Sequence, residues 1–357
     1  MNENYLLHNE TAKKLYFEYA KDLPIINISS HKATNRIYNN VAESFLFNDS
    51  YKKLAMRMSG VEDKYVYGDA SDYEKFKEFC RILPNFAGNP IYLLSHIELS
   101  GLYDCHLEIN EDNAERIWEH TNRVINGKRL TEQGLLNIAK MESINAIQIE
   151  WRNLLPNNPE IVDNITLTRF LLNIIDEGKN SGCKAIVCSA PLDFISPNPH
   201  KIDGIINKIK SGELTHFDDD NCLLMQIIRI LSIECKKNGW ILIFDDYGLD
   251  KKMIQYLEKN NALSKVVAPK ILELSYFENK IESFLIEYAK DNSIGSLVYA
   301  FRLRDIDIAY SRHDYFRRIV CNIIGKWVEN GEYTSDEKTL KKLIEDILYN
   351  NLKEAIS

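Results

Sequence analysis

From about residue 160 onward the chain repeats one pattern, a helix-forming stretch that ends near a glycine and is followed by a short apolar stretch. The segment ITLTRFLLNIIDEGKNSG has apolar residues at helical spacing, ends at Gly182 and precedes CKAIVCSAPLD. The same order recurs in LLMQIIRILSIECKKNG before WILIFDDYG, and in KIESFLIEYAKDNSIG before SLVYAFRLRD. A helix closed near a glycine and followed by a buried strand, three times over, is typical of helices that cover a parallel sheet.

Three further stretches have the same apolar density and bring the predicted strands to six. They are LPIINISSHKATN near the start of the chain, SINAIQIEW and APKILELSYF. A length of 357 residues suits an α/β barrel with insertions in one domain. We therefore expect a single α/β barrel domain over residues 1–357. Whether the barrel is complete stays open, because only six strands are identified.

Residues 32–140 have a mostly helical pattern, which predicts a helical insertion after the first strand. One example is SDYEKFKEFCRIL, which follows a Ser71 or Asp72 cap and places apolar residues on one face. The segment YSRHDYFRRIVCNIIGKWVENG and the later DEKTLKKLIEDILYNNLKEAI are also amphipathic. We expect the helices of residues 305–357 to pack on the barrel.

Charge and cysteine usage exclude several classes of protein. The chain has 52 acidic and 44 basic side chains, and no block of Lys and Arg is long enough to neutralise a nucleic-acid backbone. Charged residues interrupt the first thirty positions and no long apolar run exists, so we expect no membrane segment and a cytoplasmic location. The seven scattered cysteines suit buried thiols in a reducing compartment. Cys188, near a strand end, stays open as a nucleophile.

Long stretches at both ends of the chain resemble the uronate isomerases, which are members of the metal-dependent amidohydrolase superfamily. The stretches are NYLLHNETAKKLYFEYAKDLPII, GDASDYEKF, GNPIY and, near the C-terminus, YSRHDYFRRIVCNIIGKWVENGE and DILYNN. The resemblance covers residues 4–130 and 296–357. It implies a (β/α)8 barrel with a helical insertion after the first strand, a divalent metal of the zinc type, and the interconversion of aldose and ketose forms of D-glucuronate or D-galacturonate.

The metal motif of the family is largely replaced in this chain. Its D-x-H-x-H pattern on the first strand falls on Asn27, Ser29 and His31, and its later metal-binding Asp falls on Leu303. A serine hydroxyl is a poor ligand for a divalent metal compared with an imidazole, and one histidine is not a site. We therefore expect His31 to be the only possible metal ligand among these positions, and no metal to be bound.

The other site motifs are partly retained. The family motif D-H-Y-K-W-R appears as DSYKKL and keeps Tyr51, and the motif that begins at Gly88 keeps His96. The resemblance and the strand ends together give the candidate residues. The catalytic candidates are His31, Tyr51, Asp245 and Asp246, and the substrate-binding candidates are Arg302, Arg304 and His96.

Each candidate also has a structural interpretation. Asp245 and Asp246 follow a strand and could join His31 and Glu150 in an oxygen-rich cation site, or they could cap a helix. His31 could bind a ligand or the backbone, and Tyr51 could donate to substrate or pack in the insertion.

Two arginines of the last predicted strand have the same ambiguity. Arg302 and Arg304 alternate along this strand, which suits the carboxylate of a uronic acid but also salt bridges to nearby helices. The motif RHDYFRR, which begins at Arg312, is interpreted as structural.

Three functions follow from these observations. The first is a uronate isomerase whose activity is weak or lost because its metal ligands are replaced. The second is a non-catalytic relative that binds a sugar acid or assembles with an active partner. The third is a metal-dependent hydrolase built on Asp245 and Asp246. Missing strands would expose sheet edges, so a homo-oligomer is also expected.

Overall fold

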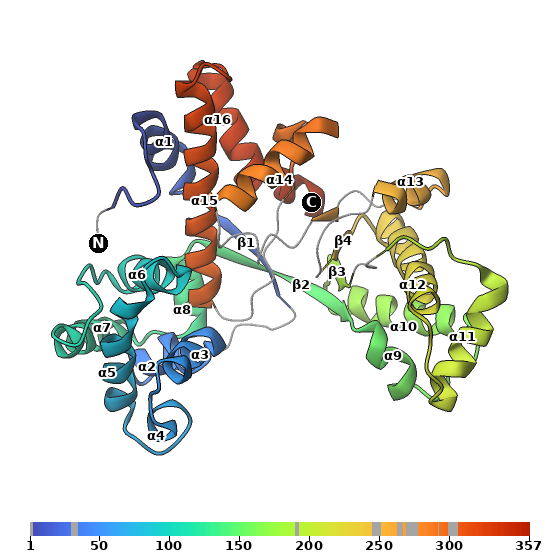
Figure 1. Ribbon diagram of the computed structural model, residues 1–357, viewed down its shortest axis with the longest axis horizontal. Coiled ribbons are helices and arrows are strands. Elements are labelled where there is room, and N and C mark those ends of the chain that lie inside the picture. Colours follow the sequence, from blue (N-terminus) through green and yellow to red (C-terminus); the bar gives the residue numbers. More distant parts are fainter. Residues whose placement is uncertain are drawn as a thin grey trace.

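The computed structural model describes residues 3–29, 35–189, 193–244, 251–262, 267–268, 278–291, 293–298 and 306–357. Its centre is a curled parallel sheet with the strand order β1-β2-β3-β4-β5 (Figure 1). The strands are β1 (Ile25–Ser29), β2 (Met141–Ile149), β3 (Ala185–Cys188), β4 (Ile241–Phe244) and β5 (Val267–Ala268).

Each strand pairs in parallel with the strand that follows it in the chain. Ser29 lies opposite Asn145, and Cys188 lies opposite both Ile149 and Phe244. Four of the six predicted strands are thereby confirmed at their predicted places. The other two, APKILELSYF and SLVYAFRLRD, fall almost entirely outside the described residues. The parallel sheet and its helical crossovers are thus established for the described part of the chain.

Between β1 and β2 the described chain is helical, and Figure 1 shows these helices gathered on one side of the sheet, in blue to teal. Ser71 is the N-cap of α5 and forms a capping box with Glu74. Phe45, Phe76 and Phe79 pack in the core of this group of helices. The elements are α2 (Val41–Phe45), α3 (Ser50–Met58), α4 (Asp63–Val66), α5 (Asp72–Ile82), η2 (Leu83–Phe86), α6 (Pro90–Tyr103), α7 (Ala114–Lys128) and α8 (Glu132–Ile138).

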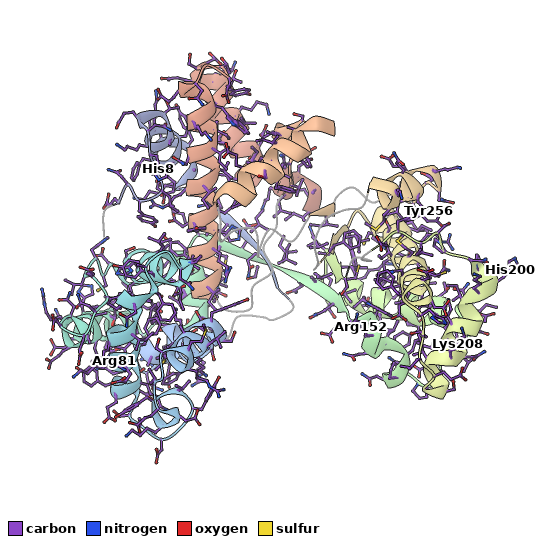
Figure 2. The ribbon with its side chains drawn as sticks, in the orientation of Figure 1. His8, Arg81, Arg152, His200, Lys208 and Tyr256 are labelled. Atoms are coloured by element: carbon purple, nitrogen blue, oxygen red, sulfur yellow. The ribbon has the colours of Figure 1, made fainter. Side chains whose placement is uncertain are left out.

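A second group of helices covers the outer face of β2, β3 and β4. Ile186, Leu242 and Phe244 pack against apolar side chains of these helices, whereas His200 and Lys208 lie on the exposed side of α11 (Figure 2). Gly239 ends α12 with φ +66, as the sequence pattern predicts. The helices are α9 (Trp151–Asn157), α10 (Asn164–Asn180), α11 (Pro199–Ser211), α12 (Phe217–Asn238) and α13 (Lys251–Lys259).

The third group is built around the long helix α15 (Ile306–Glu329). Gly325 lets α1 approach closely, because a Cβ at this position would lie 2.7 Å from the backbone nitrogen of Ala12. Arg317 donates to the carbonyl oxygens of Leu23 and Pro24, both at 2.9 Å, and so fixes the chain just before β1. The other elements are α1 (Glu10–Lys14), η1 (Leu15–Ala20), α14 (Glu278–Asp291), η4 (Ile294–Ser296), α16 (Glu337–Glu345) and η5 (Asp346–Asn350).

A buried ion pair holds the N-terminal segment against α15. The carboxylate of Asp314 accepts from Arg318 Nε at 2.8 Å and from the hydroxyl groups of Tyr5 and Tyr16. The Arg318 guanidinium carbon lies 3.8 Å from the centroid of the Tyr5 ring and 4.0 Å from that of Tyr16. These contacts agree with the structural interpretation of the second half of RHDYFRR.

The inner face of the sheet is covered by the short helix α17 (Asn351–Ile356). Its residues Leu352, Ala355 and Ile356 pack in one apolar cluster with side chains of β1 to β4. Two lysines place α17 at the starting ends of the strands. Lys353 Nζ lies 2.7 Å from the carboxylate of Glu142 in β2, and Lys184 Nζ donates to the carbonyl oxygen of Ile356 at 2.9 Å just before β3. The carboxyl ends of the strands are therefore the ends that α17 does not cover.

None of the described helices is both long and apolar enough to cross a membrane.

Candidate functional site

Three of the seven predicted site residues follow the carboxyl ends of described strands. β1 ends at Ser29 and β4 ends at Phe244, immediately before the segments that carry His31, Asp245 and Asp246. Because the strands are parallel, these segments leave the sheet at the same edge. The side chains of His31, Asp245, Asp246, Arg302 and Arg304 lie outside the described residues, so their roles stay predictions.

The described residues at the family's ligand positions do not fit a divalent metal. In β1 the chain has Ser29 where the family motif has a metal-binding histidine, and Asn27 where it has an acidic residue; serine is a poor ligand compared with histidine. Within the described ranges, no three His, Cys, Asp or Glu side chains are arranged to hold a metal ion. Glu150, a proposed partner of the aspartates, instead accepts from Asn153 Nδ2 at 2.9 Å at the start of α9. We therefore derive no reaction step through a metal.

A cavity of about 300 Å³ lies between α3, α6 and the beginning of α15. Helix α15 begins directly after the last predicted strand, which carries Arg302 and Arg304, and α3 and α6 belong to the connection that follows β1. The cavity is therefore built from the connection that follows β1 and from the first turns of α15.

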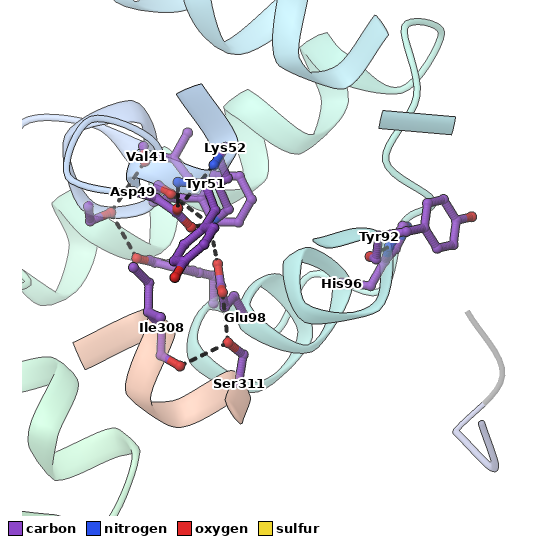
Figure 3. A network of polar contacts seen from close by, with 12 residues as sticks. Val41, Asp49, Tyr51, Lys52, Tyr92, His96, Glu98, Ile308 and Ser311 are labelled. Atoms are coloured by element: carbon purple, nitrogen blue, oxygen red, sulfur yellow. Dashed lines mark hydrogen bonds and ion pairs between the residues drawn. The ribbon is translucent and has the colours of Figure 1, made fainter. Parts of the chain in front are cut away.

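Lys52 and Glu98 form a buried ion pair beside this cavity (Figure 3). Each residue is 1% exposed, and the ammonium of Lys52 also donates to the carbonyl oxygen of Phe45 at 2.8 Å. The other carboxylate oxygen of Glu98 accepts from Ser311 Oγ at 2.8 Å. Burial raises the pKa of Glu98, and the nearby Lys52 opposes that rise. Asp49 lies 3.4 Å from the ammonium and caps α3.

Sequence reasoning did not single out Glu98. A signal was present, because Glu98 stands in PIYLLSHIELSGLY, a helix with apolar residues on nearly every side. A carboxylate in such a helix is buried and needs a cation. The partner lies on another helix and could not be identified from the spacing.

Tyr51 stands at the mouth of the cavity. It is 55% exposed, in the first turn of α3, and its ring lies 5.4 Å from the guanidinium carbon of the buried Arg312. Tyr51 and Arg312 come from two parts of the sequence that resemble the same family. Arg312 faces the cavity, so the first arginine of RHDYFRR differs from Arg317 and Arg318, which hold the N-terminal segment. Donation by the Tyr51 hydroxyl to a substrate stays a prediction.

His96 lies apart from Lys52 and Glu98, beside Tyr92 (Figure 3). Its Nδ1 donates to the carbonyl oxygen of Tyr92 at 2.7 Å, and its Nε2 accepts from the backbone N–H of Ile109 at 3.0 Å. Burial lowers the pKa of His96, which agrees with a neutral ring. Both ring nitrogens of His96 are therefore hydrogen-bonded to the backbone of this chain. These contacts favour a structural role, and binding of substrate by His96 stays a prediction.

The curled parallel sheet and the cavity define an α/β chain whose candidate site lies on the connection after β1 and on the first turns of α15. A family model described as glucuronate isomerase matches residues 1–148 and 304–355. These two parts include both sides of the cavity, with Tyr51 and Glu98 in the first and Arg312 in the second. The chain belongs to the glucuronate isomerase family.

Curated relatives carry the same description. The chain is 28% identical to a uronate isomerase of Brachyspira hyodysenteriae, with 98% of each chain covered. It is also 28% identical to a uronate isomerase of Caldicellulosiruptor bescii, with 99% of this chain and 98% of the relative covered. The first alignment spans 459 positions, more than the 357 residues of this chain, so segments of the relative are missing here.

Two solved structures have the same fold. A uronate isomerase from Thermotoga maritima superposes with a TM-score of 0.79 at 20% identity, covering 100% of this chain and 99% of that one. A glucuronate isomerase from Caulobacter crescentus superposes with a TM-score of 0.77 at 13% identity, covering 100% and 96%.

Proposed function

We propose that this chain binds a hexuronic acid, D-glucuronate or D-galacturonate, and interconverts its aldose and ketose forms at a reduced rate. Membership of the glucuronate isomerase family supports the reaction, and the names of the curated relatives support the substrate class. The reason for the reduced rate is that Ser29 replaces a metal-binding histidine of the family motif and Leu303 replaces its metal-binding aspartate. The observation that carries the proposal is the position of Tyr51, exposed in the first turn of α3 with its ring beside Arg312.

We further propose that residues 1–357 form one (β/α)8 barrel domain, with residues 32–140 as an insertion and residues 305–357 as helices packed on the barrel. The similarity to the solved uronate isomerase structures supports this arrangement. Assembly into a homo-oligomer and a cytoplasmic location stay predictions.

The chemistry requires a proton to move between adjacent carbons of the sugar while the carbonyl oxygen gains negative charge. In our proposal the Tyr51 hydroxyl donates a hydrogen bond to that oxygen. Arg302 and Arg304 bind the carboxylate of the substrate through charge-assisted hydrogen bonds. His31 or Asp245 takes the proton from one carbon and returns it to the next.

The test compares two exposed tyrosines in the purified full chain. Ketose formation from D-glucuronate and from D-galacturonate is followed by proton NMR. Tyr51→Phe is expected to slow the reaction about a hundredfold, because a donor to the developing oxyanion is lost. Tyr67→Phe is the matched control, since Tyr67 is 58% exposed on the surface near α3 and is expected to leave the rate unchanged. Equal rates for both variants would remove Tyr51 from the mechanism.

The non-catalytic alternative also has an observation in its favour, namely Ser29 in place of a metal-binding histidine of the family motif and Leu303 in place of its metal-binding aspartate. Saturable uronate binding without any ketose product would establish this alternative in place of the isomerase. Metal analysis of the same sample distinguishes a protein that binds a metal through other residues from one that binds no metal. The hydrolase alternative gains no support, because Asp245 and Asp246 lie outside the described residues.

A further inference from the structure

A second cavity, of about 260 Å³, lies between the N-terminal segment (residues 3–21), the end of α6 and the first half of α15. Its described lining residues are all different from those of the cavity beside Tyr51. On α6, Ser100 lines this second cavity whereas Ser95 lines the other, so the two cavities lie on different faces of the helix. The volume is sufficient for a single sugar ring.

Tyr310 contributes a hydroxyl group that is available to a ligand. This hydroxyl lines the second cavity and forms no hydrogen bond with the described residues. Gly101 of α6 leaves room for it, because a Cβ at that position would overlap the hydroxyl. Burial raises the pKa of Tyr310, so the hydroxyl stays protonated and can donate. A partly buried hydroxyl of this kind favours a ligand that can accept a hydrogen bond.

Charged side chains of the second cavity add acceptors and a donor. The carboxylate of Glu3 pairs with none of the described side chains. Asp104 accepts from His106 Nε2 at 3.1 Å, and its side chain is 89% exposed. The ammonium of Lys21 lies 5.4 Å from the centroid of the Phe17 ring and forms no ion pair within the described part of the chain. These groups can therefore bind a ligand without breaking an ion pair of the fold.

The balance of charge in the second cavity favours a neutral ligand. Asp314 and Arg318 neutralise each other. The two remaining carboxylates disfavour an anion, and the ammonium of Lys21 disfavours a cation. Each hydroxyl group of a ligand both donates and accepts, so a molecule with several hydroxyl groups can use the donors and the acceptors of the cavity together. The Phe17 ring adds an apolar surface for its C–H groups.

A hexuronic acid fits this cavity less well than a neutral sugar. Its carboxylate would lie near the carboxylates of Glu3 and Asp104. His96 also lines the cavity, but both of its ring nitrogens are hydrogen-bonded to the backbone, so it offers a ligand no free donor or acceptor. Tyr51, the described residue to which the isomerase reaction is assigned, is not part of this lining.

We propose that the second cavity binds one neutral monosaccharide in its ring form, hydrogen-bonded to the Tyr310 hydroxyl, the Lys21 ammonium and the Glu3 carboxylate. This binding does not rest on the isomerase activity of the chain.

The test uses the full chain, with D-glucose and D-galactose as probes and isothermal titration calorimetry as the measurement. Every titration is carried out without and with saturating D-glucuronate, present at the same concentration in cell and syringe, so that any uronate site is occupied in the second series. At least one of the two sugars is expected to bind saturably in both series, at one molecule per chain.

Two variants remove ligand contacts without removing a contact of the fold. Tyr310→Phe is expected to weaken sugar binding about fivefold, because a sugar hydroxyl loses its donor. Glu3→Gln, at an exposed position, is expected to weaken it about threefold. Tyr333→Phe is the matched control, since Tyr333 is 38% exposed and does not line the second cavity.

Absence of saturable binding by both sugars would overturn the proposal, and so would equal affinities of the Tyr310→Phe and Tyr333→Phe variants. Sugar binding that is lost when D-glucuronate is present would also contradict it, because the sugar would then occupy the uronate site or the cavity would accept an anion. Sugar binding that persists with D-glucuronate and is weakened by Tyr310→Phe supports the proposal, whether or not the chain forms ketose.

Discussion

Lys52→Met is expected to lower the free energy of unfolding by about 3 to 5 kcal/mol, because it leaves the carboxylate of Glu98 buried without its cation. Both residues are 1% exposed, so water cannot replace the ammonium without a rearrangement. Methionine has a similar length and keeps most of the packing of the lysine stem. After the substitution Glu98 retains the hydrogen bond from Ser311.

Protonation of Glu98 limits the loss of unfolding free energy in Lys52→Met and makes that loss depend on pH. Taking up a proton at pH 7 costs about 4 kcal/mol for a carboxyl group with an ordinary pKa near 4.3. At pH 5 the same step costs about 1 kcal/mol. In the variant the folded pKa of Glu98 is raised above the unfolded value, so stability is greatest below about pH 4.3 and falls as the pH rises towards the folded pKa. The loss relative to the parent chain should therefore be larger at pH 7 than at pH 5.

Urea denaturation at pH 5 and pH 7 measures these differences, with the fluorescence of the four tryptophans as the signal. The double variant Lys52→Met with Glu98→Leu should recover much of the loss, since it removes both charges. Lys53→Met, at the next position of α3, is the control and should change the stability by less than about 1 kcal/mol. A loss that is the same at both pH values, or a double variant as unstable as the single one, would refute the reasoning.

Three further outcomes are expected from thermal and urea unfolding. Arg318→Met should cost about 3 kcal/mol, because buried Asp314 keeps only hydroxyl donors, and limited proteolysis should then release the N-terminal segment first. Gly325→Ala should cost about 1 to 3 kcal/mol through its clash with α1, whereas Gly127→Ala, with no atom within 4 Å of the new Cβ, should be neutral or stabilising. The folded pKa of His96 is lowered, so its stability contribution is present above about pH 6.5 and is lost as the pH falls, by up to about 1.4 kcal/mol per pH unit. His96→Asn should make that slope shallower, and an unchanged slope would contradict the assignment.

The repeated pattern of helix, glycine and apolar stretch was enough to predict the parallel sheet. Buried parallel strands are continuous apolar runs, and left-handed glycines end helices, so Gly182 and Gly239 mark the borders of elements in a single sequence. The sequence predicts a cap at Ser71 or Asp72 for the same reason, because capping depends on neighbours along the chain, and the structure has Ser71 as the N-cap. Local chemistry therefore accounts for most of what the sequence revealed about the fold.

Contacts between distant segments were beyond the reach of sequence patterns. The periodicity of DEKTLKKLIEDILYNNLKEAI predicts a helix, and the structure has α16, η5 and α17 there in direct succession. Helical spacing identifies an apolar face without saying which surface it covers. In the same way, Lys52 belongs to the motif DSYKKL, but its pairing with Glu98 depends on how two helices pack. The candidate site could be named from the sequence in part, and its cavity could not.

The position of α17 also bears on how fast the chain can fold. Ile26 and Ile356 share one apolar cluster although they lie far apart in the sequence. Contacts between such distant positions form slowly, because a long loop must close before they contribute any stability. Until α17 docks, the isoleucine and valine side chains on the inner face of β1 to β4 stay open to other chains. Because α17 covers these side chains, its docking is expected to protect the protein from aggregation.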